Sequence, residues 1–79
     1  MKARVFVTLK KSVLDPQGVA VKQALEHMNF GNVGDVRVGK MIELTLDASK
    51  PAGDKEIKEM CEKLLANTVI EDYRYEIER

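Results

Sequence analysis

VGDVRVGKMIELTLD, residues 33–47 of the 79-residue chain, is the stretch that decides the fold. One set of its hydrophobic residues stays on even-numbered positions, namely Val36, Val38, Ile42, Leu44 and Leu46. A two-residue hairpin at Gly39–Lys40 would instead pair Val38 with Met41. It would place the odd-numbered residues Met41, Glu43 and Thr45 in the core. The pattern therefore favours one long strand with a bend or bulge at Gly39, and the hairpin is the alternative.

A helix is predicted on the N-terminal side of this stretch, from Pro16 to about Met28. Asp15 can cap free backbone N–H groups, and proline fits the first helical position. Asn29 and Gly31 suit the end of the helix. Hydrophobic residues follow at i, i+3, i+4 and i+7, which predicts one hydrophobic stripe of Val21, Ala24, Leu25 and Met28.

A second helix is predicted after the loop Ser49–Asp54, with Asp54 as its cap and its end near Ala66–Asn67. The same spacing recurs in Ile57, Met60, Cys61 and Leu64. Two flanking segments, Ala3–Lys10 and Val69–Glu78, alternate hydrophobic and polar residues, as half-buried strands do.

These elements predict a single domain, residues 1–79, of the α+β class. The order β-α-β-α-β, with a long bent middle strand, predicts a two-layer sandwich in which two helices cover one face of an antiparallel sheet. A turn at Gly39–Lys40 would make the order βαββαβ, which is ferredoxin-like. Three strands leave two open edges, and open edges favour pairing with another copy.

Composition excludes several classes of protein. Lys plus Arg and Asp plus Glu both number 13, so the chain lacks the basic excess of nucleic-acid binders, and we expect no nucleic acid. No segment reaches the roughly 20 apolar residues of a membrane span, so no membrane association is expected. The start of the chain lacks the apolar run of a signal peptide, and one free cysteine favours the cytoplasm.

No catalytic, cofactor-binding or metal-binding residue is predicted. His27 has no nucleophile or carboxylate nearby in sequence and suits a helix end. Cys61 lies on a hydrophobic stripe, where a small core residue is expected. The glycines at 31, 34 and 39 form no phosphate-binding motif, and the acidic residues show no metal-binding spacing.

Three segments strongly resemble the PurS family, the small subunit of bacterial and archaeal phosphoribosylformylglycinamidine (FGAM) synthase. They read VLDPQGVAVKQAL (Val13–Leu25), VRVGKMIEL (Val36–Leu44) and MCEKLLANTVIEDY (Met60–Tyr73), and the resemblance extends over essentially the whole chain. Thr68, where the family often has Pro, and Asn29, where it often has Gly, are departures beyond the helix ends.

The resemblance implies a role in purine synthesis. The family's complex makes formylglycinamidine ribonucleotide from formylglycinamide ribonucleotide, glutamine and ATP. A glutaminase subunit releases ammonia, and a large synthetase subunit uses ATP and Mg. The small subunit is expected to form a homodimer or a higher oligomer, to bridge the other two and to aid ammonia transfer, with no cofactor of its own.

Other classes of function remain as alternatives. A free-standing regulatory module could bind a small ligand between α+β dimers. An RNA-binding βαββαβ domain is disfavoured, because it needs aromatic side chains on the sheet for base stacking and only two Phe and two Tyr are present.

Interface residues are predicted from two signals. Phe6 and Ile70 point away from their hydrophobic neighbours, toward the open face of the sheet. The other five candidates match the family's signatures without an obvious core role: Asp15, Pro16, Gln17, Arg37 and Lys40.

Overall fold

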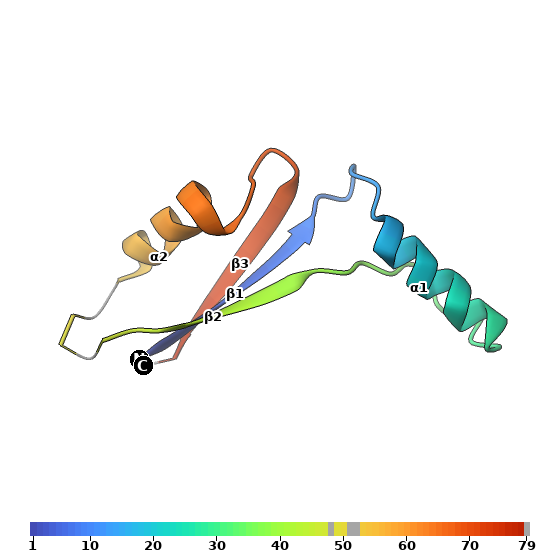
Figure 1. Ribbon diagram of the computed structural model, residues 1–79, viewed down its shortest axis with the longest axis horizontal. Helices are drawn as coiled ribbons and strands as arrows, with labels where there is room; N and C mark the ends of the chain where they lie inside the picture. Colours follow the sequence, from blue (N-terminus) through green and yellow to red (C-terminus); the bar gives the residue numbers. More distant parts are fainter. Residues whose placement is uncertain (48, 51–52, 79) are drawn as a thin grey trace.

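The computed structural model describes residues 1–47, 49–50 and 53–78, so the predicted loop Ser49–Asp54 lies partly outside the described residues. The chain runs in the order β-α-β-α-β (Figure 1). The elements are β1 Lys2–Leu9, α1 Pro16–His27, β2 Lys40–Thr45, α2 Asp54–Met60 with a wider helical turn η1 at Cys61–Leu65, and β3 Glu71–Glu78.

The strands form one antiparallel sheet in the order β2-β1-β3. Val5 in the central strand lies opposite Ile42 on one side and Tyr75 on the other. The predicted α+β class and element order are therefore confirmed. Gly39–Lys40 is not a hairpin turn, because the chain continues from residues 33–38 into β2 without reversing (Figure 1). The predicted long strand is paired only over Lys40–Thr45.

The core lies between the sheet and the α2–η1 helix. Ala3, Val5 and Val7 on β1 are buried against Ile57 and Cys61 on the helix, as the two periodicities predict. Half-buried side chains from the two outer strands, β2 with the residue after it and β3, surround them, namely Ile42, Leu44, Leu46, Tyr73, Tyr75 and Ile77. Burial raises the pKa of the Cys61 thiol, so this cysteine is an inert core residue.

The end of the second helix differs from the expected stripe. The Ala66 N–H donates to the Cys61 carbonyl five residues earlier, which makes a wider turn than an α-helix has. The extra residue in this turn rotates the stripe. Leu65 is half-buried, and Leu64, predicted to lie in the core, is 82% exposed. The N-cap residue is Gly53, and Asp54 lies in the first turn.

Helix α1 does not cover the sheet. It projects from one end of the molecule as an arm, and only α2 and η1 lie over the sheet (Figure 1). The radius of gyration is 16.0 Å and the longest dimension 51 Å, whereas a compact chain of this length has a radius of gyration of about 12 Å. The prediction of both helices on one face is therefore wrong. The hydrophobic spacing of α1 identifies one side of the helix, but it does not identify the surface that covers that side.

Gly39 explains how the chain passes from the arm into the sheet. A Cβ atom at this position would overlap the Val7 carbonyl oxygen of β1. Glycine therefore lets the extended segment cross the end of the central strand at close range.

Candidate functional site

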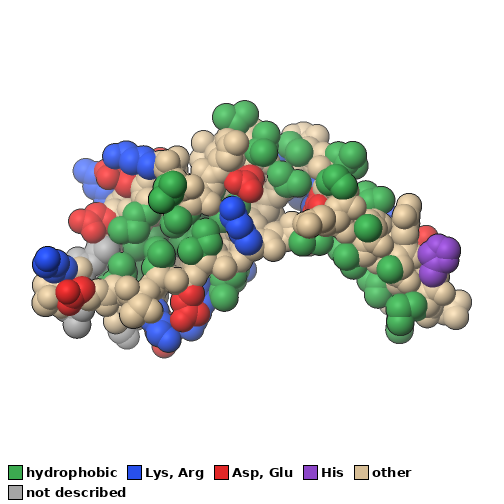
Figure 2. Space-filling view, in the orientation of Figure 1, with side chains coloured by type: hydrophobic (Ala, Val, Ile, Leu, Met, Phe, Trp, Pro, Cys, Tyr) green, Lys and Arg blue, Asp and Glu red, His purple; other side chains and the backbone are tan. Residues whose placement is uncertain are grey.

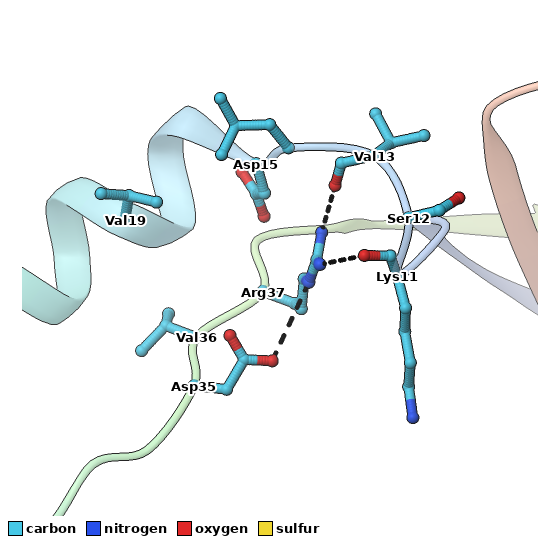
Figure 3. Close-up of a pocket in the computed structure, with 9 residues that line it drawn as sticks. Lys11, Ser12, Val13, Asp15, Val19, Asp35, Val36 and Arg37 are labelled. Carbon is cyan, nitrogen blue, oxygen red and sulfur yellow. Dashed lines mark hydrogen bonds and ion pairs between the residues drawn. The ribbon is translucent and has the colours of Figure 1, made fainter.

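The base of the arm is built from two segments that lie far apart in the sequence. We call this region the junction and define it as residues 11–18, the loop and first turn of α1, with residues 35–39, the extended segment before β2. Figure 3 shows the two segments close together, and residues from both line a hollow of about 370 Å³. The junction includes the beginnings of two of the three segments that resemble the PurS family, residues 13–18 and 36–39.

Asp15 holds the junction from one side. Its Oδ1 accepts the Gly18 N–H at 3.0 Å, which confirms the predicted helix cap. Its Oδ2 accepts the Val38 N–H at 2.7 Å, from the other segment. These two bonds, that from Val38 first, hold the pKa of the buried Asp15 carboxyl below its usual 3.8, with a smaller contribution from the Arg37 charge.

Arg37 holds the junction from the other side. Its guanidinium donates to the carbonyl oxygens of Val13 at 2.7 Å and Lys11 at 2.9 Å (Figure 3). Its Nε also lies 3.9 Å from Asp35 Oδ2. The side chain thereby gives hydrogen bonds to two carbonyl groups of the loop that precedes α1. Gly18 is buried at the centre, where a Cβ atom would overlap the Val36 carbonyl oxygen.

The seven predicted interface residues occupy different environments. Asp15 and Arg37 have partners within the chain, and their position at the junction gives them a structural role. Pro16, Gln17 and Lys40 are exposed. Whether any of these five touches a partner stays a prediction.

The two candidates on the sheet need one correction. Phe6 lies on the open face as expected, but the Arg74 guanidinium covers its ring at 4.0 Å. Ile70 does not lie on that face, because β3 begins at Glu71 and Ile70 belongs to the preceding turn. The Ile70 carbonyl accepts the Lys10 N–H there. Charged side chains such as Arg4, which pairs with Glu43 and Glu78, occupy much of the open face.

Asp15→Asn should loosen the junction without removing the helix cap. The amide retains one acceptor oxygen for Gly18, but its NH₂ group would face the Val38 N–H. Because the Asp15 pKa is lowered by folding, its stabilisation is present above the unfolded value near 3.8 and is lost as the pH falls through the folded value. We therefore expect the variant to unfold several degrees below the wild type at pH 7 and to show less further loss at low pH. Thermal unfolding followed by circular dichroism from pH 7 to 2.5 measures both effects, and parallel curves would contradict this role of Asp15.

No catalytic constellation emerges in the described part of the chain. His27 is exposed in the last turn of α1, far from the buried Cys61. The described residues contain no group of three or more His, Cys, Asp or Glu side chains able to hold a metal ion. Among them there is also no helix with the length and apolar character needed to cross a membrane. The cytoplasmic location stays a prediction.

Two exposed hydrophobic surfaces were missed by the sequence analysis (Figure 2). The first, the arm ridge, comprises Leu14, Val21 and Met28, which are 73%, 42% and 64% exposed. The second, the edge groove, lies between β2 and the second helix and is lined by four hydrophobic and three charged residues, namely Leu44, Met60, Leu64 and Leu65 with Glu56, Glu59 and Lys63. The small number of predicted strands could have indicated these surfaces, because a single helix leaves part of the face of a three-stranded sheet uncovered.

Comparison with known proteins gives a consistent family match. The family model described as PurS, phosphoribosylformylglycinamidine (FGAM) synthase, matches residues 2–79. The chain is similar to the FGAM synthase subunit PurS of Bacillus subtilis, with 62% identity over 77 residues, covering 98% of this chain and 92% of that protein.

Solved structures agree with the sequence match. The structure of B. subtilis PurS superposes with a TM-score of 0.85, at 62% identity, covering 99% of this chain and 98% of that one. A chain in the structure of PurLQS from Thermotoga maritima superposes with a TM-score of 0.77, at 29% identity, covering 95% and 93%. The second match is to a protein within an assembly of subunits.

Proposed function

Because the chain belongs to the PurS family, we propose that it bridges the glutaminase and synthetase subunits of FGAM synthase and has no catalytic group of its own. FGAM synthase is a glutamine-dependent ligase of purine biosynthesis, and this chain is its PurS subunit. Its partners in the PurLQS complex are PurL and PurQ.

The observation that carries the bridging role is the arm. Helix α1 extends from the sheet with much of its hydrophobic surface exposed, although hydrophobic stripes of small domains are normally buried. An elongated chain offers two well-separated ends for contacts with different subunits. Gln17 and Lys40 add exposed polar groups, and Pro16 is exposed beside Gln17.

The chemistry belongs to the other two subunits in this proposal. ATP and Mg are used by the complex, and ammonia is released by the glutaminase subunit and consumed by the synthetase subunit. The small subunit holds the two sites in one assembly and aids the passage of ammonia between them. It needs surfaces for this work and no reactive side chain.

Co-elution tests the bridge directly. Purified glutaminase and synthetase subunits, with glutamine and Mg-ATP, should elute together from a sizing column only when this chain is added. The eluted complex should contain all three subunits. If the two large subunits associate equally well without it, the bridging role is wrong even though family membership stands.

Self-association is the second part of the proposal. Exposed hydrophobic surface on both arm and sheet, two open strand edges and zero net charge all favour a homodimer or a higher oligomer. Analytical ultracentrifugation at micromolar concentration should give at least twice the mass of 8.9 kDa. A monomer over the whole concentration range would refute self-association.

A further inference from the structure

The outer edge of β3 is an unpaired strand edge. β3 lies at one side of the sheet and pairs only with β1 (Figure 1). Its register against β1 continues without interruption from Leu9 opposite Glu71 to Lys2 opposite Glu78, so no bulge bends this edge. The strand also contains no proline. Bulges and prolines are two common devices that protect exposed edges from pairing, and β3 has neither.

Two hydrogen bonds at the ends of the sheet show which residues of β3 direct their backbone groups outward. The Lys10 N–H donates to the Ile70 carbonyl, so even-numbered residues of β1 and β3 bond to each other. The Leu46 N–H donates to the Met1 carbonyl, so odd-numbered residues of β1 bond to β2, as the same alternation requires. Odd-numbered residues of β3 therefore direct their N–H and C=O groups away from β1.

Three residues offer both backbone groups at this edge, namely Tyr73, Tyr75 and Ile77. None of them forms a backbone hydrogen bond outside the sheet in the described part of the chain, whereas the Glu71 N–H already donates to Asn67. Their side chains lie on the helix side of the sheet and are half-buried. A strand added beside β3 would bond to these groups and would place its own hydrophobic residues next to theirs.

The open face of the same edge is acidic. The charged residues of β3 are four acids and one base, namely Glu71, Asp72, Glu76, Glu78 and Arg74. The Arg74 guanidinium is already occupied, because it covers the Phe6 ring and lies 3.0 Å from a carboxylate oxygen of Glu76. Asp72 is exposed opposite the uncharged Thr8 of β1, and no ion pair joins it to another described residue. This face of the edge therefore favours lysine or arginine on an added strand.

We propose that the outer edge of β3 docks an extended segment of a large subunit of the synthase, in which hydrophobic and basic residues alternate. Its hydrophobic residues lie beside Tyr73, Tyr75 and Ile77, and a lysine or arginine pairs with Asp72. Main-chain hydrogen bonds supply affinity in such strand addition, and alternate side chains supply specificity. A second copy of β3 is a poorer occupant, because it would double the excess of acid. The inference rests on the bridging function proposed above and assigns one of its contacts.

Amide hydrogen exchange tests the docking residue by residue. In the free chain the N–H groups of Tyr73, Tyr75 and Ile77 should exchange rapidly, and those of Arg74 and Glu76, which bond to β1, should be protected. In the complex with the large subunits, protection of the three odd-numbered residues should rise by about tenfold or more, because each gains a hydrogen bond. Exchange quenched at a series of times, followed by dissociation and NMR of this chain, measures both states.

A change to the backbone alone tests the same contact. Ligation at Cys61 joins residues 1–60 to a synthetic peptide of residues 61–79 that carries an N-methyl group on Tyr75. The methyl group removes one outward N–H and keeps the side chain, so the thermal unfolding of the chain should match that of an unmodified ligated control. The dissociation constant for the large subunits, from sedimentation titration, should rise by about tenfold or more.

Charge reversal tests the acidic face. Asp72→Lys should raise the same dissociation constant by about tenfold or more, because it sets like charges opposite each other. Glu59→Lys makes the same change in net charge on α2, at an exposed residue that lines the groove beside β2, and should leave the constant unchanged. Equal weakening by both variants would contradict the contact at Asp72.

The outcomes separate the docking from the wider proposal. A wild-type chain that associates with neither large subunit overturns the bridging function and the docking together. Association that leaves Tyr73, Tyr75 and Ile77 unprotected, or that the N-methyl group does not weaken, overturns the docking alone. Protection of these three residues already in the free chain would show that a second copy occupies the edge, which also overturns the docking and leaves the bridge standing.

Discussion

Omitting this chain from a reconstituted synthase should lower synthesis of the amidine from glutamine much more than synthesis from ammonium salt. We expect a loss of about tenfold to a hundredfold with glutamine, because a shared partner raises the effective concentration of one site near the other by such factors. Loss with excess ammonium should be small. Initial rates of amidine formation at equal subunit concentrations measure both.

The physical reason is the fate of free ammonia. Ammonia released by a separate glutaminase becomes dilute and is mostly protonated at neutral pH. When the two sites are bridged, ammonia reaches the synthetase site before it is diluted or protonated. Excess ammonium salt supplies enough unprotonated ammonia to bypass the bridge. The synthetase itself therefore retains most of its activity without the small subunit.

Adding the chain back in equal amount is the control and should restore the glutamine-dependent rate. Equal losses with glutamine and with ammonium would mean that the small chain helps to build the synthetase site, and the bridging role would be wrong. No loss in either assay would contradict any role of this chain in catalysis by the complex.

Gly18→Ala should disrupt the junction. The added Cβ would overlap the Val36 carbonyl oxygen, and because this oxygen belongs to the backbone, α1 or the extended segment has to move. Overpacking of this kind costs about 1–3 kcal/mol in the free energy of unfolding, against a gain of about 1 kcal/mol from alanine in a helix. Movement also breaks the bond from the Val38 N–H to Asp15, so we expect a net loss of stability. Urea unfolding measures it.

Gly31→Ala is the matched control. No atom lies within 4 Å of its Cβ position, and its φ is not positive, so alanine fits without strain. We expect the control to match the wild type in unfolding free energy and in co-elution with the large subunits. The Gly18 variant should lose co-elution as well, because its arm no longer has the correct direction. Equal behaviour of the two variants would show that the junction does not set the direction of the arm.

Local patterns in the sequence are enough to identify the helices, the strands and the side of each that faces inward. A period of two in Ala3–Lys10 and a period near 3.6 around Ile57 and Cys61 identify the residues that form the core, because backbone geometry sets which side chains share a face. The Asp15–Pro16 pair identified the start of α1 for the same local reason. The family, too, was recognised from the sequence alone.

Tertiary structure decided what each face meets. The hydrophobic stripe of α1 does not predict that the helix projects away from the sheet. Periodicity shows which side of a helix is hydrophobic, but not which surface covers that side. Leu64 moved to the surface because a wider turn rotated the helix after Cys61. The junction depends on contacts between residues more than twenty positions apart, such as Asp15 with Val38 and Arg37 with Val13. No local pattern encodes such contacts, because they form only when the packed chain brings the two segments together.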